Sequence, residues 1–115
     1  MPKDKNIVML EGVVGDDYKY KKTQEGKEYA TFSLCINSFD KELADSTERT
    51  HSQAYIRIHV YDKRLLEYLQ KVNAHRGQRA NVFGRLVSFR SEQKGISYIV
   101  NNVICRDISI IKTKE

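Results

Sequence analysis

Residues 54–72 read AYIRIHVYDKRLLEYLQKV, and the spacing of the apolar residues changes within this stretch. In its first half Ile56, Ile58 and Val60 occupy alternate positions, which is the period of a β-strand with one buried side. From Asp62 onward the leucines recur at helical spacing, and the aspartate is suited to cap the helix N-terminus. The stretch therefore predicts a strand followed at once by a short helix.

Strand-like segments flank this stretch on both sides. Two precede it, at 6–14 and 29–37, and two follow it, at 79–90 and 97–111. A β-sandwich would show about seven short strands, and a βαβ protein would alternate helices with strands throughout. Five long strands with one helix between the third and fourth are typical of the oligonucleotide/oligosaccharide-binding (OB) barrel.

Two glycines, Gly12 and Gly84, fall inside the first and fourth predicted strands. A closed barrel bends these strands sharply, and glycine allows such a bend because it has no β-carbon. Ordinary β-bulges are the alternative interpretation. We predict an all-β fold, a five-stranded OB barrel with one short helix between strands 3 and 4. It forms a single domain over residues 1–115, with its core at about 6–111.

Length, charge and apolar content limit the class of protein. The chain has 115 residues, a net charge of +5 and a pI near 9.2, a mild basic excess that favours polyanionic partners. No apolar run approaches the roughly 18 residues of a membrane helix, and the N-terminus resembles neither a secretory signal nor a transit peptide. We expect a cytoplasmic protein of the bacterial nucleoid, or a processed form in the mitochondrial matrix.

The residues that usually perform catalysis or bind metals are scattered along the chain. Cys35 and Cys105 lie far apart without metal-ligand spacing, and the three histidines fall on three different segments. Asp16, Asp17 and Glu11 are more simply a charged turn than a nuclease cation site. We therefore expect no enzyme, no metal and no cofactor.

The outward side of the third predicted strand carries Tyr55, Arg57, His59 and Tyr61. A solvated strand usually presents smaller polar residues there, so this composition needs an explanation. In one interpretation the tyrosines pack under a loop or against a second subunit, and Arg57 pairs with a carboxylate. In the other the face is a stacking platform, on which flat rings receive unstacked bases and the guanidinium contacts phosphate.

Aromatic and basic side chains are also mixed in two other segments. The fourth predicted strand has Val82, Gly84 and Leu86 in the inward register, and it leads into a basic hairpin. The stretch DYKYKK lies between the first two strands, although it could equally be a solvated loop. Three such segments together favour the stacking platform. The additional candidate nucleic-acid-binding residues are Phe89, Arg85, Arg90 and Lys94 near the hairpin, and Tyr18, Lys19, Tyr20, Lys21 and Lys22 in DYKYKK.

Five motifs follow one another along residues 6–111. They are NIVMLEGVVGDD, EGKEYATFSLCIN, ERTHSQAYIRIHVYDK, LLEYLQKVNAHRGQRANVFGRL and the long final strand. No single motif is diagnostic, but their order and spacing together resemble the bacterial and mitochondrial single-stranded DNA-binding (SSB) protein family.

The resemblance implies binding of single-stranded DNA without strong sequence preference, in replication, recombination or repair. It places Tyr55 at the family's stacking Trp and Tyr61 at its stacking Phe, with Arg57 at a basic position of the same strand. Phe89 and Phe39 lie near two further stacking aromatics of the family. Binding of RNA stays open, because a stacking platform reads the face of a base and not its sugar.

The resemblance also implies self-association into a homotetramer. The segment Ile7, Val8, Met9 and Leu10 is apolar enough to be a poor exposed sheet edge, so pairing with a second copy would remove a liability. We expect this segment at the oligomer interface.

Among the departures of the sequence from the family pattern, two concern the stacking residues and the C-terminus. It contains no Trp, and it ends in SIIKTKE, whereas family members continue into a disordered tail with an acidic tip. We therefore expect no partner recruitment through such a tip. Two alternatives stay open, a primosome-like dimeric replication accessory protein and an OB-fold protein-interaction subunit.

Overall fold

The computed structural model describes residues 4–39 and 51–111, and at positions 38, 39, 51 and 52 it describes the backbone alone. The expectations placed on the Phe39 side chain and on the C-terminal residues 112–115 therefore lie outside the described residues. The elements in chain order are β1 (Val8–Val14), β2 (Lys19–Lys22), β3 (Glu28–Phe39), β4 (His51–Val60), α2 (Lys63–Lys71), β5 (Arg79–Gln93) and β6 (Ile96–Ile111).

The strands form one sheet that closes on itself. Its order is β1-β5-β6-β4-β3-β2, and a further pairing of β1 with β3 joins the ends of the ring. β4 and β6 run parallel, while the other pairs are antiparallel. This ring, with α2 between β4 and β5, confirms the predicted OB architecture. The structure adds the short strand β2, which pairs with β3 where the sequence suggested a solvated basic segment.

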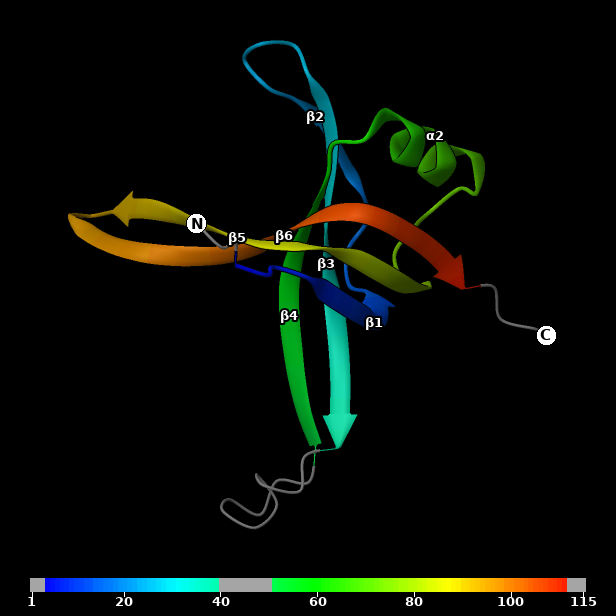
Figure 1. The fold of residues 1–115 in the computed structure, drawn as a ribbon, viewed down its shortest axis with the longest axis horizontal. Helices are drawn as coiled ribbons and strands as arrows, with labels where there is room; N and C mark the ends of the chain where they lie inside the picture. Colours follow the sequence, from blue (N-terminus) through cyan, green and yellow to red (C-terminus); the bar gives the residue numbers. More distant parts are fainter. Residues whose placement is uncertain (1–3, 40–50, 112–115) are drawn as a thin grey trace.

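Two long hairpins leave the closed part of the sheet and cross in the view of Figure 1. One is β3–β4, whose pairing continues to Phe39 and His51, further than the sequence analysis placed the strand ends. The other is β5–β6, which turns at Lys94 and Gly95, both with positive φ. These arms extend the outer surface of the barrel well beyond its core.

Close approach between strands explains both glycines inside strands. A β-carbon on Gly12 would run into the carbonyl oxygen of Cys35, at the point where β1 changes its partner from β5 to β3. A β-carbon on Gly84 would run into the carbonyl oxygen of Ile104, beside a register shift in the β5–β6 ladder. Gly84 is therefore both a bend of the barrel and the site of a bulge.

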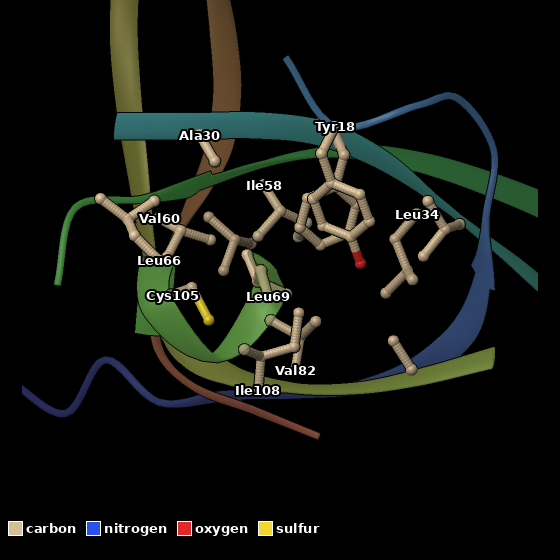
Figure 2. Close-up of a cluster of buried hydrophobic side chains, with 14 residues drawn as sticks. Tyr18, Ala30, Leu34, Ile58, Val60, Leu66, Leu69, Val82, Cys105 and Ile108 are labelled. Atoms are coloured by element: carbon tan, nitrogen blue, oxygen red, sulfur yellow. The ribbon is translucent and has the colours of Figure 1, made fainter. Parts of the chain in front are cut away.

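The core lies inside the ring and is closed at one end by α2 (Figure 2). Asp62 caps this helix by accepting a hydrogen bond from the Arg64 backbone N–H at 2.8 Å, in agreement with the sequence prediction, and the buried Leu66 and Leu69 face the barrel. The largest fully buried side chains are Phe32, Leu34, Ile58, Leu69, Val14, Val60 and Val103. No helix in the described part of the chain is long and apolar enough to cross a membrane.

The structure corrects two sequence predictions about burial. The sequence predicts that Tyr18 faces nucleic acid, but it lies in the core with its ring 4.5 Å from that of Phe32, because the chain turns inward before β2 (Figure 2). Burial also raises the pKa of its hydroxyl well above the ordinary range. The sequence predicts an inward register for Leu86, yet this residue is exposed, because the β5–β6 arm has already left the barrel at this position.

Candidate nucleic-acid interface

The outer face of the sheet carries alternate residues of β3 and β4. Ala30, Phe32 and Ile58 point into the core, so their neighbours along the strands point outward. The strand register places Thr31 opposite His59. The same register places Ser33, Arg57 and Asn102 side by side across three strands. The alternation read from the sequence is thus the alternation of the folded strand.

Four aromatic rings gather at the β2 end of this face. The ring centroids of Tyr29 and Tyr61 are 5.2 Å apart and nearly parallel, and His59 lies 6.2 Å from Tyr61 and 6.1 Å from Tyr29. Phe89, from the β5–β6 arm, meets His59 edge-on at 6.3 Å. The Lys27 ammonium lies 5.4 Å from the centre of the Tyr61 ring. We call Tyr29, His59, Tyr61 and Phe89 the aromatic cluster.

Tyr29 belongs to this cluster but is not among the residues that the sequence analysis singles out. It is the second residue of β3 and shares the outward register of Thr31, two positions later. The same alternation that exposes the face of β4 therefore points to Tyr29. Its position at the end of a predicted strand hides it, because strand ends are the least certain part of such a prediction.

Tyr55 stands apart from the aromatic cluster, further along β4. This residue is 65% exposed, and its hydroxyl donates a long hydrogen bond of 3.4 Å to Gln53. Neither a loop nor a core residue covers it among the described residues. A large, flat and exposed aromatic side chain of this kind is suited to stack against a planar ligand.

Arg57 is held by a carboxylate on the outer face. Its Nη1 lies 3.2 Å from Oδ2 of Asp16, whose other oxygen accepts hydrogen bonds from the Ser33 backbone N–H at 2.7 Å and hydroxyl at 3.0 Å. Although burial acts to raise it, these bonds and the guanidinium charge lower the pKa of Asp16. The carboxylate pairing considered for Arg57 is thus present, and it fixes the guanidinium on the outer face.

His59 is joined to β6 through Asn102, with 3.0 Å between the histidine Nε2 and the carboxamide nitrogen. Burial is the main reason that the pKa of His59 is lowered, and the positive charges of Arg57 and Lys21 add to the shift. The imidazole is therefore neutral at pH 7, so it serves this face as an aromatic and hydrogen-bonding group and not as a cation.

The basic segment in β2 divides between two faces. Lys19 and Lys21 line a hollow of about 410 Å³ on the outer face, together with Arg57 and His59. Tyr20 instead lines a separate hollow beside α2, and Lys22 lies 3.9 Å from Glu28. Only half of this segment faces the aromatic cluster, because a strand alternates its side chains.

The predicted residues of β5 divide in the same way. Arg85 and Phe89 share the outer register with Ile104 and Val100 of β6. Arg90 points to the opposite face of the arm, where its Nη1 donates to the Ser97 hydroxyl at 3.3 Å. Lys94 lies at the turn.

No group of three or more His, Cys, Asp or Glu side chains within residues 4–39 and 51–111 is placed to hold a metal ion.

Comparison with known proteins gives a family match over most of the chain. The sequence model of the Single-strand binding protein family matches residues 5–111. Among solved structures, a Plasmodium falciparum SSB in complex with ssDNA superposes with a TM-score of 0.84 at 26% identity, covering 97% of this chain and 99% of that one. The S. cerevisiae mitochondrial single-stranded DNA binding protein Rim1 superposes with a TM-score of 0.72 at 13% identity, covering 98% and 100%, which supports the fold alone. No curated protein sequence matches the chain.

Proposed function

This chain belongs to the single-strand binding protein family, and we propose that it binds its strand by stacking bases on the outer face of β3, β4 and β5 and by contacting phosphates with the basic side chains around them. Binding of single-stranded DNA follows from the family, whose roles lie in replication, recombination and repair. The proposal adds the residues and the absence of strong sequence preference. The role that we propose for the protein is binding and not catalysis.

The observation that carries the proposal is the aromatic cluster beside three cations. Tyr29 and His59 of this cluster line the same hollow as Lys19, Lys21 and Arg57. Tyr55 extends the surface along β4. Rings stack on any base, and ammonium or guanidinium groups attract any phosphate, so this combination tolerates every sequence. Phe39, Arg90, Lys94, Tyr20 and Lys22 stay proposed contacts of lower rank, since they lie at the ends of the surface, face away from it or fall outside the described side chains. Arg85 is a further proposed contact in the outer register of β5.

Titration with a poly(dT) oligomer tests the proposal directly. We expect tight binding to the single strand and weak binding to a duplex of the same length, because only unstacked bases can lie on the rings. Binding is measured by the quenching of tyrosine fluorescence, since the chain contains seven Tyr and no Trp. Equal affinity for duplex and single strand at moderate salt would contradict the proposal.

Variants of β2 separate phosphate contacts from stacking. Each phosphate neutralised on a single strand adds about 0.7 to the slope of log affinity against log salt. Lys21→Ala is therefore expected to lower this slope, whereas Tyr55→Ala weakens binding at an unchanged slope. Lys71→Ala is the matched control, because this exposed lysine lies on α2 and not on a strand of the outer face.

We further propose that the chain pairs with a second copy through β1, and that two such dimers form a homotetramer. Its segment Val8–Gly12 pairs with β5 on one edge, and the described part of the chain provides no partner for the other edge before Val13. Met9 is 76% exposed and Ile7 64%, while Val8 and Leu10 pack on the core. An open strand edge with exposed apolar side chains is suited to pair with a second copy.

Light scattering at micromolar concentration checks this assembly. We expect four times the 13.4 kDa chain mass, and a smaller species for Met9→Glu, which places a charge at the proposed interface. A monomeric wild-type protein would reject the assembly. A dimer would favour the alternative of a primosome-like accessory protein. Either way the protein would work where DNA is single-stranded, in a bacterial nucleoid or a mitochondrial matrix.

A further inference from the structure

The hollow of about 410 Å³ on the outer face is a built site with its own polar floor. Four strands contribute to its lining, namely β2, β3, β4 and β6. The lining residues are Lys19, Lys21, Tyr29, Thr31, Arg57, His59, Val100 and Asn102. Three of these side chains are cations. Asp16 is the acidic side chain bonded to Arg57, one of these cations. Its carboxylate oxygens already accept hydrogen bonds from Ser33 and Arg57.

Two buried polar atoms of this lining have no hydrogen-bond partner within the described residues. One is Oγ1 of Thr31, whose residue is only 5% exposed, and the other is Nδ1 of His59. Buried polar groups are nearly always paired, so two unpaired ones side by side in the strand register indicate a ligand group. Because both atoms lie at the bottom of the cationic hollow, the ligand group would bind there.

The chemistry of these atoms defines the ligand. The Asn102 carboxamide nitrogen donates to Nε2 of His59, so the neutral imidazole carries its proton on Nδ1 and presents a donor there. The threonine hydroxyl can also donate, and the lysines and Arg57 are donors without acceptors. A base edge mixes donors and acceptors, whereas a phosphate offers only acceptor oxygens and a negative charge. The lining therefore matches a phosphate group.

We propose that this hollow holds one phosphodiester group of the bound strand, and that His59 takes up a proton when the phosphate enters. The inference rests on the proposed function, since the phosphate comes from single-stranded DNA. It adds one defined phosphate position to a surface of otherwise general contacts, and it makes binding depend on pH. On protonation a half-turn of the Asn102 carboxamide presents its oxygen to Nε2, so both ring nitrogens donate.

The charges around His59 set the direction of this dependence. In the unbound protein, the pKa of His59 is lowered by burial and by the positive charges of Arg57 and Lys21, so the ring is neutral. A phosphate brings a negative charge that opposes those two cations and stabilises the imidazolium. The groups that face His59 are Lys19 and Lys21 from β2, Tyr29 and Thr31 from β3, Arg57 and Tyr61 from β4, Arg85 and Phe89 from β5, and Asn102 and Ile104 from β6.

The sign follows by linkage. If the bound state holds the proton more tightly than the unbound state, affinity rises as pH falls through the interval between the two pKa values of His59. With one group involved, the change is at most about tenfold per pH unit.

The test measures poly(dT) affinity from pH 8 to pH 5.5 for the wild type and for His59→Gln, which hydrogen-bonds but does not titrate. We expect affinity to rise on acidification in the wild type and to stay flat in the variant. In parallel, NMR of the wild type follows the His59 ring, whose pKa is expected to rise on binding. An unchanged pKa, or the same pH profile in both proteins, overturns the inference even though the strand binds.

A second comparison tests the phosphate itself. A dT oligomer with a neutral methylphosphonate backbone still stacks but offers no charge. Thr31→Val is expected to weaken binding of the ordinary strand by roughly tenfold, as for loss of one hydrogen bond to a charged group, and to leave the neutral strand unaffected. Lys71→Ala, which removes an exposed charge from α2 and not from the outer face of the sheet, is the matched control and is expected to leave binding of both strands unchanged. Equal loss on both strands overturns the site, whereas absence of binding to either strand contradicts the proposed function instead.

Discussion

Replacing Gly84 with alanine is expected to lower the free energy of unfolding by about 3 kcal/mol or more, which is the upper end for overpacking in a core. The added β-carbon would meet the carbonyl oxygen of Ile104 and lie 3.2 Å from Cα of Cys105. Both are backbone atoms in the β5–β6 ladder, so no side chain can rotate away. Thermal unfolding should show a midpoint lower by roughly 10 °C or more for a domain of this size.

Gly26→Ala provides the matched control for this effect. Gly26 lies in the turn between β2 and β3 with φ of +87°, and nothing lies within 4 Å of a β-carbon built there. Alanine at this position meets only the cost of the left-handed backbone, about 1 kcal/mol. Equal losses at the two glycines would mean that close strand approach does not fix the path of β5.

The fold was predictable because its determining patterns are local. Ile56, Ile58 and Val60 set the inner face of β4 by alternation alone, and Asp62 marks the start of α2 two residues later. Five long strands around one helix then leave few topologies besides the OB barrel. Gly12 and Gly84 indicated where the strands bend, because two strands that approach each other closely leave no room for a β-carbon.

The candidate site was less predictable, because it depends on contacts between distant segments. Tyr18 and Lys19 are neighbours in one basic segment, yet one packs on Phe32 and the other lines the outer hollow. Nothing in their immediate sequence distinguishes them. The pairing of Arg57 with Asp16 spans 41 positions and likewise appears only when β4 lies beside β3 and the chain before β2.

Removal of both Tyr55 and Tyr61 is expected to cause the largest loss of single-strand binding. Each base that loses its stacking partner costs about 1–3 kcal/mol, a range known from the OB-folds of single-strand binding proteins themselves. The two rings lie at different places along the face, one exposed and one in the aromatic cluster. Their losses should therefore add, to about 2–6 kcal/mol in the double alanine variant.

The two positions also differ in what the single variants should do. Tyr55→Ala removes an exposed ring that touches little else, so binding falls while the unfolding transition stays where it is. Tyr61→Ala also removes the partner of Tyr29 and the ring beside Lys27, so some stability should be lost with the affinity. Anisotropy of a labelled dT oligomer measures binding without relying on the removed tyrosines.

Tyr55→Phe and Tyr61→Phe separate stacking from hydrogen bonding. Phenylalanine keeps the flat face and loses only the hydroxyl, which at Tyr55 makes one long bond to Gln53. If stacking is the source of affinity, both phenylalanine variants bind as the wild type does and both alanine variants do not. If Tyr55→Phe and Tyr55→Ala weaken binding equally, the hydroxyl and not the ring of Tyr55 makes the contact, and bases do not stack on this part of β4. A loss confined to Tyr61 would instead restrict the stacking surface to the aromatic cluster, where Tyr29 and Phe89 would become the next residues to replace.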